Sequence, residues 1–248
     1  MLRVKSKLIL LSLLCLSFFS SFTLVSAKEI YFTNDNGVSL TKEEYDFLTK
    51  MYWDGYQKMM TKEEYQRFDD NNIMDREYEE KVVTYNDTPL TRGTFHQSLA
   101  KSIKISRSCD SNNCAISVVL TWLGVPKVKS YDVMGCSFDN GLQLITTPST
   151  RVSSSDKTYF SDDLQVTEKK GFGSSFKIPT GTGLIINQDF YVSRNGHVYA
   201  SYQHAMSETT LAISRDYKIS GIGFGGVFEF GEKASKIYDD MNGVDIAV

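Results

Sequence analysis

Residues 98–123 carry the pattern that most constrains the fold of this chain, because two alternating runs flank a short polar loop bounded by cysteines. Apolar side chains recur at every second position on both sides of the loop, as expected of half-buried β-strands. A four-residue loop at 110–113 places Cys109 opposite Cys114 and aligns the apolar side chains of both runs on one face. The stretch therefore predicts an antiparallel hairpin closed by a Cys109–Cys114 disulfide, with one buried and one wet face.

The first 27 residues have the features of a secretory signal peptide, because basic residues precede an apolar stretch that ends in Val25-Ser26-Ala27, a small-residue cleavage site. The alternative is an uncleaved membrane anchor, since the apolar stretch is long enough to span a bilayer. Several serines interrupt that stretch, and the cleavage site fits well. We therefore expect residues 1–27 to be a signal peptide of a secreted protein without a stable membrane anchor.

Cleavage after residue 27 changes the charge of the chain. It removes three of the 27 basic residues and none of the 30 acidic ones, which takes the formal charge from −3 to −6. A mildly acidic protein lacks the basic stripe that neutralises phosphates, so nucleic acid is excluded as a partner.

Export also permits disulfides, and the mature chain keeps an odd number of cysteines. Pairing of Cys109 with Cys114 leaves Cys136 unpaired, buried or able to crosslink two chains into a dimer. Spacing alone leaves the pairing of Cys136 with either of the other two open.

The segment TKEEY occurs twice, at 41–45 and again at 61–65. Each copy is a capping box, in which the threonine hydroxyl accepts from the amide three residues later and a glutamate side chain reaches back, so each begins a helix. Aromatic and apolar residues at helical spacing follow the first copy and indicate a face that packs on another element. We assign residues 28–77 to an N-terminal helical hairpin.

Residues 78–248 show short strand-like runs separated by turn signals, without a helical period between them. This pattern predicts an all-β antiparallel sandwich, jelly-roll-like, with a short C-terminal tail. The runs at 142–147 and 209–214 are among the expected strands, whereas the serine-rich segment 149–161 is interpreted as an exposed loop.

Asn195-Gly196 is a strong signal for a two-residue hairpin turn. Such a turn pairs the strands on either side of it, and one face of the pair then carries Asn187, Asp189, Tyr191, Tyr202 and His204. Aromatic and hydrogen-bonding side chains in this mixture are typical of sites for polar ligands, sugars especially. The alternative is a solvated sheet face with ordinary cross-strand pairs.

No residue is predicted to be catalytic. A cysteine hydrolase would need Cys136 beside a histidine and an orienting carboxylate, and no nucleophile signature surrounds this residue. Carboxylate pairs for glycoside hydrolysis stay open, because 30 acidic residues offer many pairs. The histidines lack zinc-site spacing, so we expect no metal and no cofactor.

The signal peptide, the two TKEEY segments and the CDSNNC hairpin together resemble small exported proteins of Gram-positive bacteria. The resemblance implies a bacterial extracellular protein and assigns no role to any residue. The sequence thus predicts a secreted, non-catalytic protein that binds a carbohydrate or a protein, extracellularly or at the cell surface. The alternatives are a secreted hydrolase using Cys136 or a carboxylate pair, and a β-rich membrane-active protein that inserts the segment 149–161.

Overall fold

The computed structural model describes residues 28–85, 101–139, 141–220, 227–239 and 243–248. The predicted signal peptide at 1–27 and the start of the first expected hairpin at 98–100 lie outside these residues.

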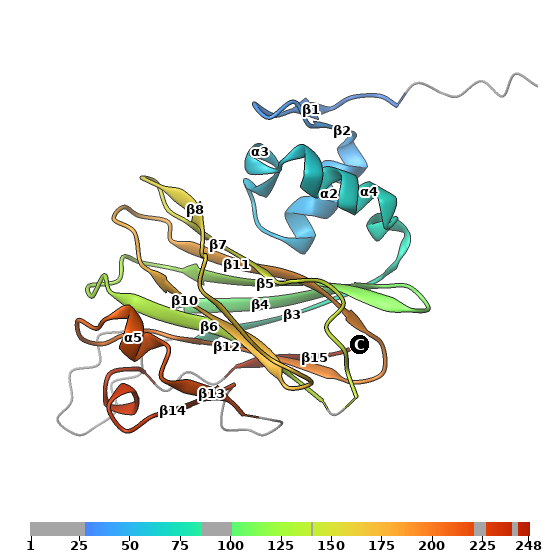
Figure 1. Cartoon of the computed structure of the whole chain (residues 1–248). Helices are drawn as coiled ribbons and strands as arrows, with labels where there is room; N and C mark the ends of the chain where they lie inside the picture. Colours follow the sequence, from blue (N-terminus) through green and yellow to red (C-terminus); the bar gives the residue numbers. More distant parts are fainter. Residues whose placement is uncertain (1–27, 86–100, 140, 221–226, 240–242) are drawn as a thin grey trace, which may run out of the picture.

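Two antiparallel sheets pack face to face and form a sandwich (Figure 1). In spatial order the six-stranded sheet contains β3 (Glu77–Tyr85), β4 (Lys101–Cys109), β5 (Asn113–Trp122), β11 (Ile185–Ser193), β7 (Ser149–Ser153) and β8 (Thr158–Phe160). The five-stranded sheet contains β15 (Val244–Ala247), β12 (His197–Gln203), β6 (Tyr131–Phe138), β10 (Gly171–Lys177) and β9 (Leu164–Thr167). The predicted all-β antiparallel sandwich is confirmed.

The first hairpin has the predicted register. Cys109 lies opposite Cys114 and the two are joined by a disulfide, while Ile103 lies opposite Leu120. In the loop, the Asp110 side chain accepts from two backbone amides and holds the turn. Alternate residues of both strands point into the core between the sheets, which also receives large aromatic side chains from the other strands. Burying one such side chain fully contributes about 1.5–3 kcal/mol.

The N-terminal segment forms a compact layer of its own, here called the helical unit (residues 28–75). It contains a two-stranded ladder of β1 (Phe32–Thr33) and β2 (Ser39–Leu40), the helices α2 (Lys42–Met51), α3 (Tyr56–Met59) and α4 (Lys62–Asp70), and the 3₁₀ turn η2 (Ile73–Asp75). Both predicted capping boxes are present, with Thr41 and Glu44 at the start of α2 and Thr61 and Glu64 at the start of α4. A third helix, α3, lies between the two predicted ones.

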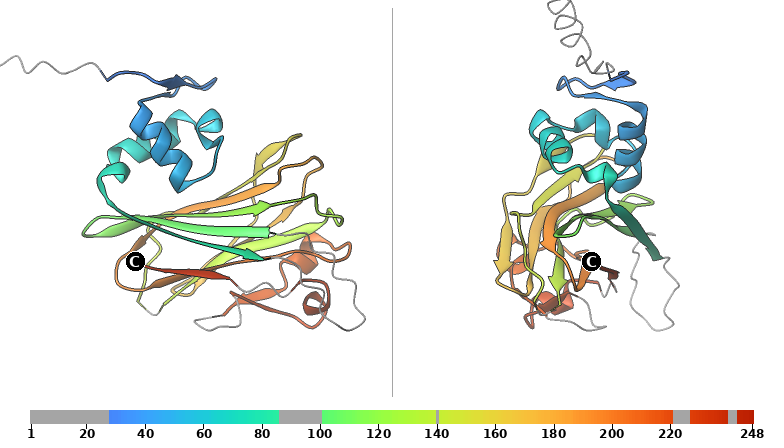
Figure 2. Two further views of the ribbon diagram at one scale, coloured as in Figure 1. Left: turned by 180° about the vertical axis from the view of Figure 1, so that it is seen from behind. Right: turned by 90° about the vertical axis from the view of Figure 1, so that its right-hand side faces the viewer.

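Each sheet carries a second layer on its outer face, and Figures 1 and 2 show these layers at opposite sides of the sandwich. The helical unit packs on the six-stranded sheet through Ala115 and Val119 of β5. On the five-stranded sheet, Val133 of β6 contacts the C-terminal elements α5 (Leu211–Ser214), β13 (Tyr217–Ile219), β14 (Phe228–Phe230) and η3 (Ala234–Lys236).

Two glycines make room for the C-terminal layer. Gly135 and Gly173 lie opposite each other on β6 and β10. A Cβ atom at Gly173 would lie 2.5 Å from the hydroxyl of Tyr217 and 2.8 Å from the ring of Phe228. The two rings therefore rest directly on the sheet backbone.

Three local predictions were wrong. Residues 142–147 are not a strand but a loop with one bridge, and 209–214 contains the short helix α5, whose N-cap Thr210 accepts from the Ile213 amide. The segment 149–161, expected to be a loop, contains β7 and β8. Val152 is the buried apolar residue of β7, so the strand shows no hydrophobic period.

The predicted C-terminal tail also contains a strand, β15, at the edge of the five-stranded sheet. Lys81 of β3 lies 2.6 Å from Asp245 of β15, and the hydroxyl of Tyr85 donates to the carbonyl of Gly243 at 2.9 Å. The first and last strands of the sandwich are therefore neighbours across the two sheets.

Candidate functional site

Two rows of side chains, mostly polar, cross the outer face of the six-stranded sheet below the helical unit; we call them the polar rows. Directly opposite residues on successive strands give the first row as Glu80, Ser106, Ser117, Asp189 and Ser149. The second row contains Lys104, Val119, Asn187 and Arg151. The helical unit buries much of these rows, and a buried polar group costs free energy unless it finds a partner.

Three of the predicted site residues belong to this face. Asn187, Asp189 and Tyr191 occupy alternate positions of β11, so their side chains point the same way, as the sequence predicts. The amide of Asn187 donates to Asp189 Oδ1 at 3.0 Å and to the hydroxyl of Ser117 at 2.9 Å. These bonds hold the carboxyl group of Asp189 in one orientation.

A pocket of about 40 Å³ lies between the helical unit and the polar rows. Its lining includes Tyr52, Tyr56, Glu64 and Arg67 from the helical unit and Asp189 and Tyr191 from β11. Pockets that enclose a whole small molecule have about 300–1,000 Å³, and a cavity needs about 10–15 Å³ of such space to hold one water. This pocket can therefore hold one small group of a larger ligand.

Asp189 is a pocket residue whose pKa is shifted strongly upward. The side chain is half-buried, and loss of water around the carboxyl group raises its pKa to about 7, although the Asn187 hydrogen bond and the charge of Arg151 act in the opposite direction. At neutral pH the group can therefore either donate or accept a hydrogen bond.

An ion pair between Arg151 of β7 and Glu64 of α4 joins the sheet to the helical unit. The Arg151 guanidinium also lies over the rings of Tyr56 and Phe160, at 5.1 Å and 4.8 Å from their centroids. Within the described part of the chain, Nη1 of Arg151 and Oδ1 of Asn187 are buried without a hydrogen-bond partner. The two residues lie directly opposite each other, so one place on the sheet has both a free donor and a free acceptor.

The other two predicted site residues lie elsewhere, because the expected pairing of the strands around Asn195-Gly196 is wrong. β11 pairs with β5 and β7, whereas β12 pairs with β6 and β15 in the other sheet. Asn195 adopts the left-handed conformation that a tight turn needs, with φ 73°, and its amide and that of Gly196 donate to the carbonyl of Val248. The turn therefore carries the chain from one sheet to the other.

Tyr202 and His204 belong to a buried polar network around Asp132 of β6. Asp132 accepts from the hydroxyl of Tyr202, and its Oδ2 lies 2.8 Å from His204 Nδ1. The indole of Trp122 donates to the same hydroxyl at 3.0 Å. Because all four side chains are buried, the network connects strands of both sheets and is not open to a ligand.

The thiol considered as a nucleophile is enclosed. Cys136 is fully buried in the core between the sheets, and burial raises the pKa of its thiol well above the usual range. The reactive thiolate is therefore disfavoured. Crosslinking of two chains through Cys136 would require the core to open.

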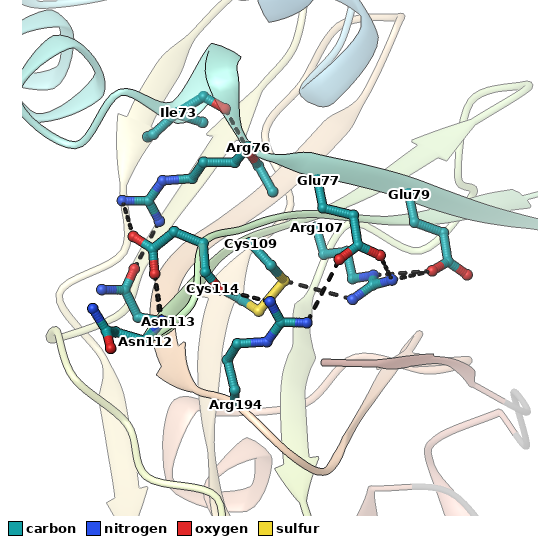
Figure 3. The surroundings of a disulfide bond; sticks show 12 residues. Ile73, Arg76, Glu77, Glu79, Arg107, Cys109, Asn112, Asn113, Cys114 and Arg194 are labelled. Atoms are coloured by element: carbon teal, nitrogen blue, oxygen red, sulfur yellow. Dashed lines mark hydrogen bonds and ion pairs between the residues drawn. A yellow bond between two sulfur atoms is a disulfide. The ribbon is translucent and has the colours of Figure 1, made fainter.

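Three arginines surround the disulfide at the end of the first hairpin, and Figure 3 shows how they converge. Arg107 pairs with Glu77 and with the neighbouring Glu79 of β3. Arg76, which follows the helical unit, lies 2.9 Å from Asp110 in the loop, and Arg194 donates to the Asp110 carbonyl at 2.6 Å. The loop is therefore held by Arg76, in the connection between helical unit and sandwich, and by Arg194, while Arg107 pairs β4 with β3.

The sequence pattern does not identify Arg151, Glu64 and Tyr56 as members of the site. Arg151 lies in the segment interpreted as a loop, and the two helical residues reach the pocket only because the helical unit docks on the sheet. The one available signal was the alternation Arg151-Val152-Ser153, which a single apolar residue leaves ambiguous.

The described residues contain neither a metal-binding cluster nor a membrane-spanning helix. No group of three or more His, Cys, Asp or Glu side chains among them could hold a metal ion. None of the helices in the described ranges is long and apolar enough to cross a membrane.

No protein-family model and no curated protein matches the sequence. The KRT10-binding region domain of the pneumococcal serine-rich repeat protein PsrP is similar over 51% of this chain and 88% of that domain, with 11% identity and a TM-score of 0.34. The pilus backbone RrgB of Streptococcus pneumoniae matches over 38% of this chain and 25% of its own, with 12% identity and a TM-score of 0.27. The enzymatically active domain of tailspike protein 4 of bacteriophage CBA120 matches over 54% and 20%, with 14% identity and a TM-score of 0.25. At these scores the likenesses carry no argument about function.

Proposed function

We propose that this chain is an exported, non-catalytic binding protein that recognises a carbohydrate at the pocket between the helical unit and the polar rows. The observation that carries the proposal is the chemistry of the pocket lining. Tyr56 and Tyr191 supply aromatic surface, while Asp189, Glu64 and Arg67 supply hydrogen-bonding groups. A sugar presents both C–H faces and hydroxyl groups, and this mixture of side chains fits both.

The size of the pocket limits what it can recognise. A volume of about 40 Å³ fits a hydroxymethyl or acetamido group and not a whole sugar ring. The ligand is therefore a polysaccharide or a glycan chain that inserts one substituent and lies across the surface with its remaining units.

Export is supported by two features of the sequence. The signal-peptide pattern at 1–27 directs the chain out of the cytoplasm, and the Cys109–Cys114 disulfide suits an oxidising compartment. A cysteine hydrolase is disfavoured because Cys136, the one free cysteine of the described residues, is buried and poorly ionised. The segment 149–161, which a membrane-active protein would insert, is paired into the six-stranded sheet.

The test is binding of the chain from residue 28 to 248 to immobilised glycans and to purified bacterial cell wall. Tyr191→Ala and Arg67→Ala should each weaken binding at least about tenfold, the cost of losing one good contact of about 1.4 kcal/mol. Tyr199→Ala is the matched control, because Tyr199 is a partly exposed tyrosine on the outer face of the other sheet. Circular dichroism confirms that each variant is folded.

Two results would contradict the proposal. One is carbohydrate binding that neither pocket substitution weakens, which would place the site elsewhere. The other is capture of protein ligands with no binding to any glycan or cell-wall fraction.

A further inference from the structure

We propose that Asp189 makes the docking of the helical unit onto the polar rows depend on pH, so that the unit is a proton-controlled cover of the six-stranded sheet. Such control is a property of the fold itself and does not depend on the identity of the ligand.

The helical unit has an apolar core that belongs largely to itself. Leu48, Met51, Tyr56, Met60 and Phe68 are buried members of that core and all come from the unit. Among the described residues, the sandwich adds the buried Ala115 and Val119 and the partly buried Tyr78, Ile185 and Tyr191. The unit can therefore keep its own core when its contact with the sheet is lost.

Where the helical unit covers the polar rows, its contact with the six-stranded sheet is polar. It includes the Glu64–Arg151 ion pair and the two buried atoms without a partner, Arg151 Nη1 and Asn187 Oδ1. A buried ion pair adds little net stabilisation, because the free energy lost by removing both charges from water offsets their attraction. Each buried polar atom without a partner adds a further desolvation cost. Interfaces of this composition within one chain typically permit relative motion.

Docking removes water from the carboxyl group of Asp189. In the docked state, polar and titratable side chains from every neighbouring element face this carboxyl group. They are Asn187 and Tyr191 on the same strand, Ser117 on β5, Arg151 on β7, and Tyr52, Tyr56, Glu64 and Arg67 on the helical unit. Arg151 favours the carboxylate, but Glu64 already pairs with this arginine and itself disfavours a second negative charge. Desolvation dominates, and the pKa of docked Asp189 rises to about 7.

The sign of the effect follows from the two states. On an open sheet face Asp189 is solvated and has an ordinary pKa near the reference value of 3.8. The docked state therefore holds a proton between about pH 4 and 7 that the undocked state has lost. Docking is strongest below this interval, weakens as the pH rises through it, and stays weak above it.

Trp53 reports on docking because it lies in the helical unit with its ring centroid 5.9 Å from the Arg151 guanidinium. The other tryptophan of the chain, Trp122, is buried between the sheets. The experiment measures acrylamide quenching of tryptophan fluorescence in the chain 28–248 at about pH 5 and about pH 8.5, on either side of the expected transition. A Trp53→Phe variant gives the contribution of Trp122, so that of Trp53 is obtained by difference.

We expect the quenching constant of Trp53 to rise at least about twofold from the lower to the higher pH, with that of Trp122 and the helical circular dichroism signal unchanged. Asp189→Asn, which mimics the protonated carboxyl group, should remove the change. Asp245→Asn is the matched control, because this aspartate pairs with Lys81 at a distant edge of the sandwich, and it should behave like the unaltered chain.

Three results would overturn the inference: equal quenching of Trp53 at both pH values, a pH effect that persists in Asp189→Asn, or a change that includes Trp122 or the helical signal. The last would mean unfolding and not undocking. None of these measurements uses a ligand, so their failure is distinct from failure of carbohydrate binding.

Discussion

Arg151 and Glu64 connect two parts of the fold that are far apart in the sequence, and their side chains are only 3% and 10% exposed. The same glutamate is the N3 residue of the capping box of α4. One side chain therefore both begins a helix and ties that helix to the sheet.

We predict that Glu64→Gln destabilises the protein by about 3–5 kcal/mol, because glutamine keeps the capping box but leaves the buried Arg151 without its counter-ion. Glu44→Gln is the matched control. It alters the same position of the other TKEEY copy, where the cation is Lys28, whose side chain is 57% exposed and can return to water. Urea unfolding should show a much smaller loss for Glu44→Gln, about 1 kcal/mol or less. Equal losses would show that the buried Arg151 ion pair stabilises the protein no more than the exposed Lys28 ion pair does.

Removal of the disulfide should lower the stability by about 2 kcal/mol, the chain entropy of a loop as short as that between Cys109 and Cys114. The double substitution Cys109→Ser and Cys114→Ser tests this by thermal or urea unfolding. The unaltered chain, unfolded in the presence of a reductant, provides the comparison and should match the double variant. A double variant as stable as the oxidised chain would show that the ion pairs around the loop hold the hairpin without help.

Gly173→Ala should destabilise the protein by about 1–3 kcal/mol through overpacking, since the added methyl group would overlap the hydroxyl of Tyr217. Tyr217→Phe alone should have little effect, because the described residues offer this buried hydroxyl no hydrogen-bond partner. Combined with Gly173→Ala it should restore part of the lost stability. Absence of any rescue, measured by urea unfolding, would place the strain at Phe228 instead.

Cys136 should resist alkylation in the folded protein. Burial raises the pKa of its thiol, so the fraction of thiolate at neutral pH is small, and the core blocks the reagent. We expect iodoacetamide at about pH 7.5 to leave the native chain unmodified by mass spectrometry and to label one site after unfolding in urea without reductant. Rapid labelling of the native chain would revive the cysteine hydrolase hypothesis.

The first hairpin could be predicted to the level of register because every determinant lies in one short stretch. The period of two, the loop length and the cysteine pair each constrain the same alignment, and the Cys109–Cys114 pairing agrees with all of them. The second turn, at Asn195-Gly196, fixed a reversal of the chain but not the sheet in which the next strand pairs. Local turn chemistry contains no information about that choice, which depends on contacts with β5 and β6.

About half of the candidate site could be predicted from the alternation of side chains along a β-strand. Asn187, Asp189 and Tyr191 occupy every second position and so share one face of any strand that contains them. The remainder depends on docking between distant segments. Arg151 comes from a strand with too few apolar residues to be recognised, and Glu64 reaches it only through the packing of the helical unit. The prediction for Tyr202 and His204 was wrong because β12 pairs in the other sheet.

The contact between β3 and β15 has a consequence for how the protein matures. Lys81 and Asp245 lie at opposite ends of the sandwich sequence, so the contact that joins the first and last strands forms only after nearly the whole domain has been synthesised. Contacts of such long sequence separation slow folding. Until the final strand pairs, the edge of β12 that it covers is open to pairing with other chains, and this exposure is the kinetic cost of the topology.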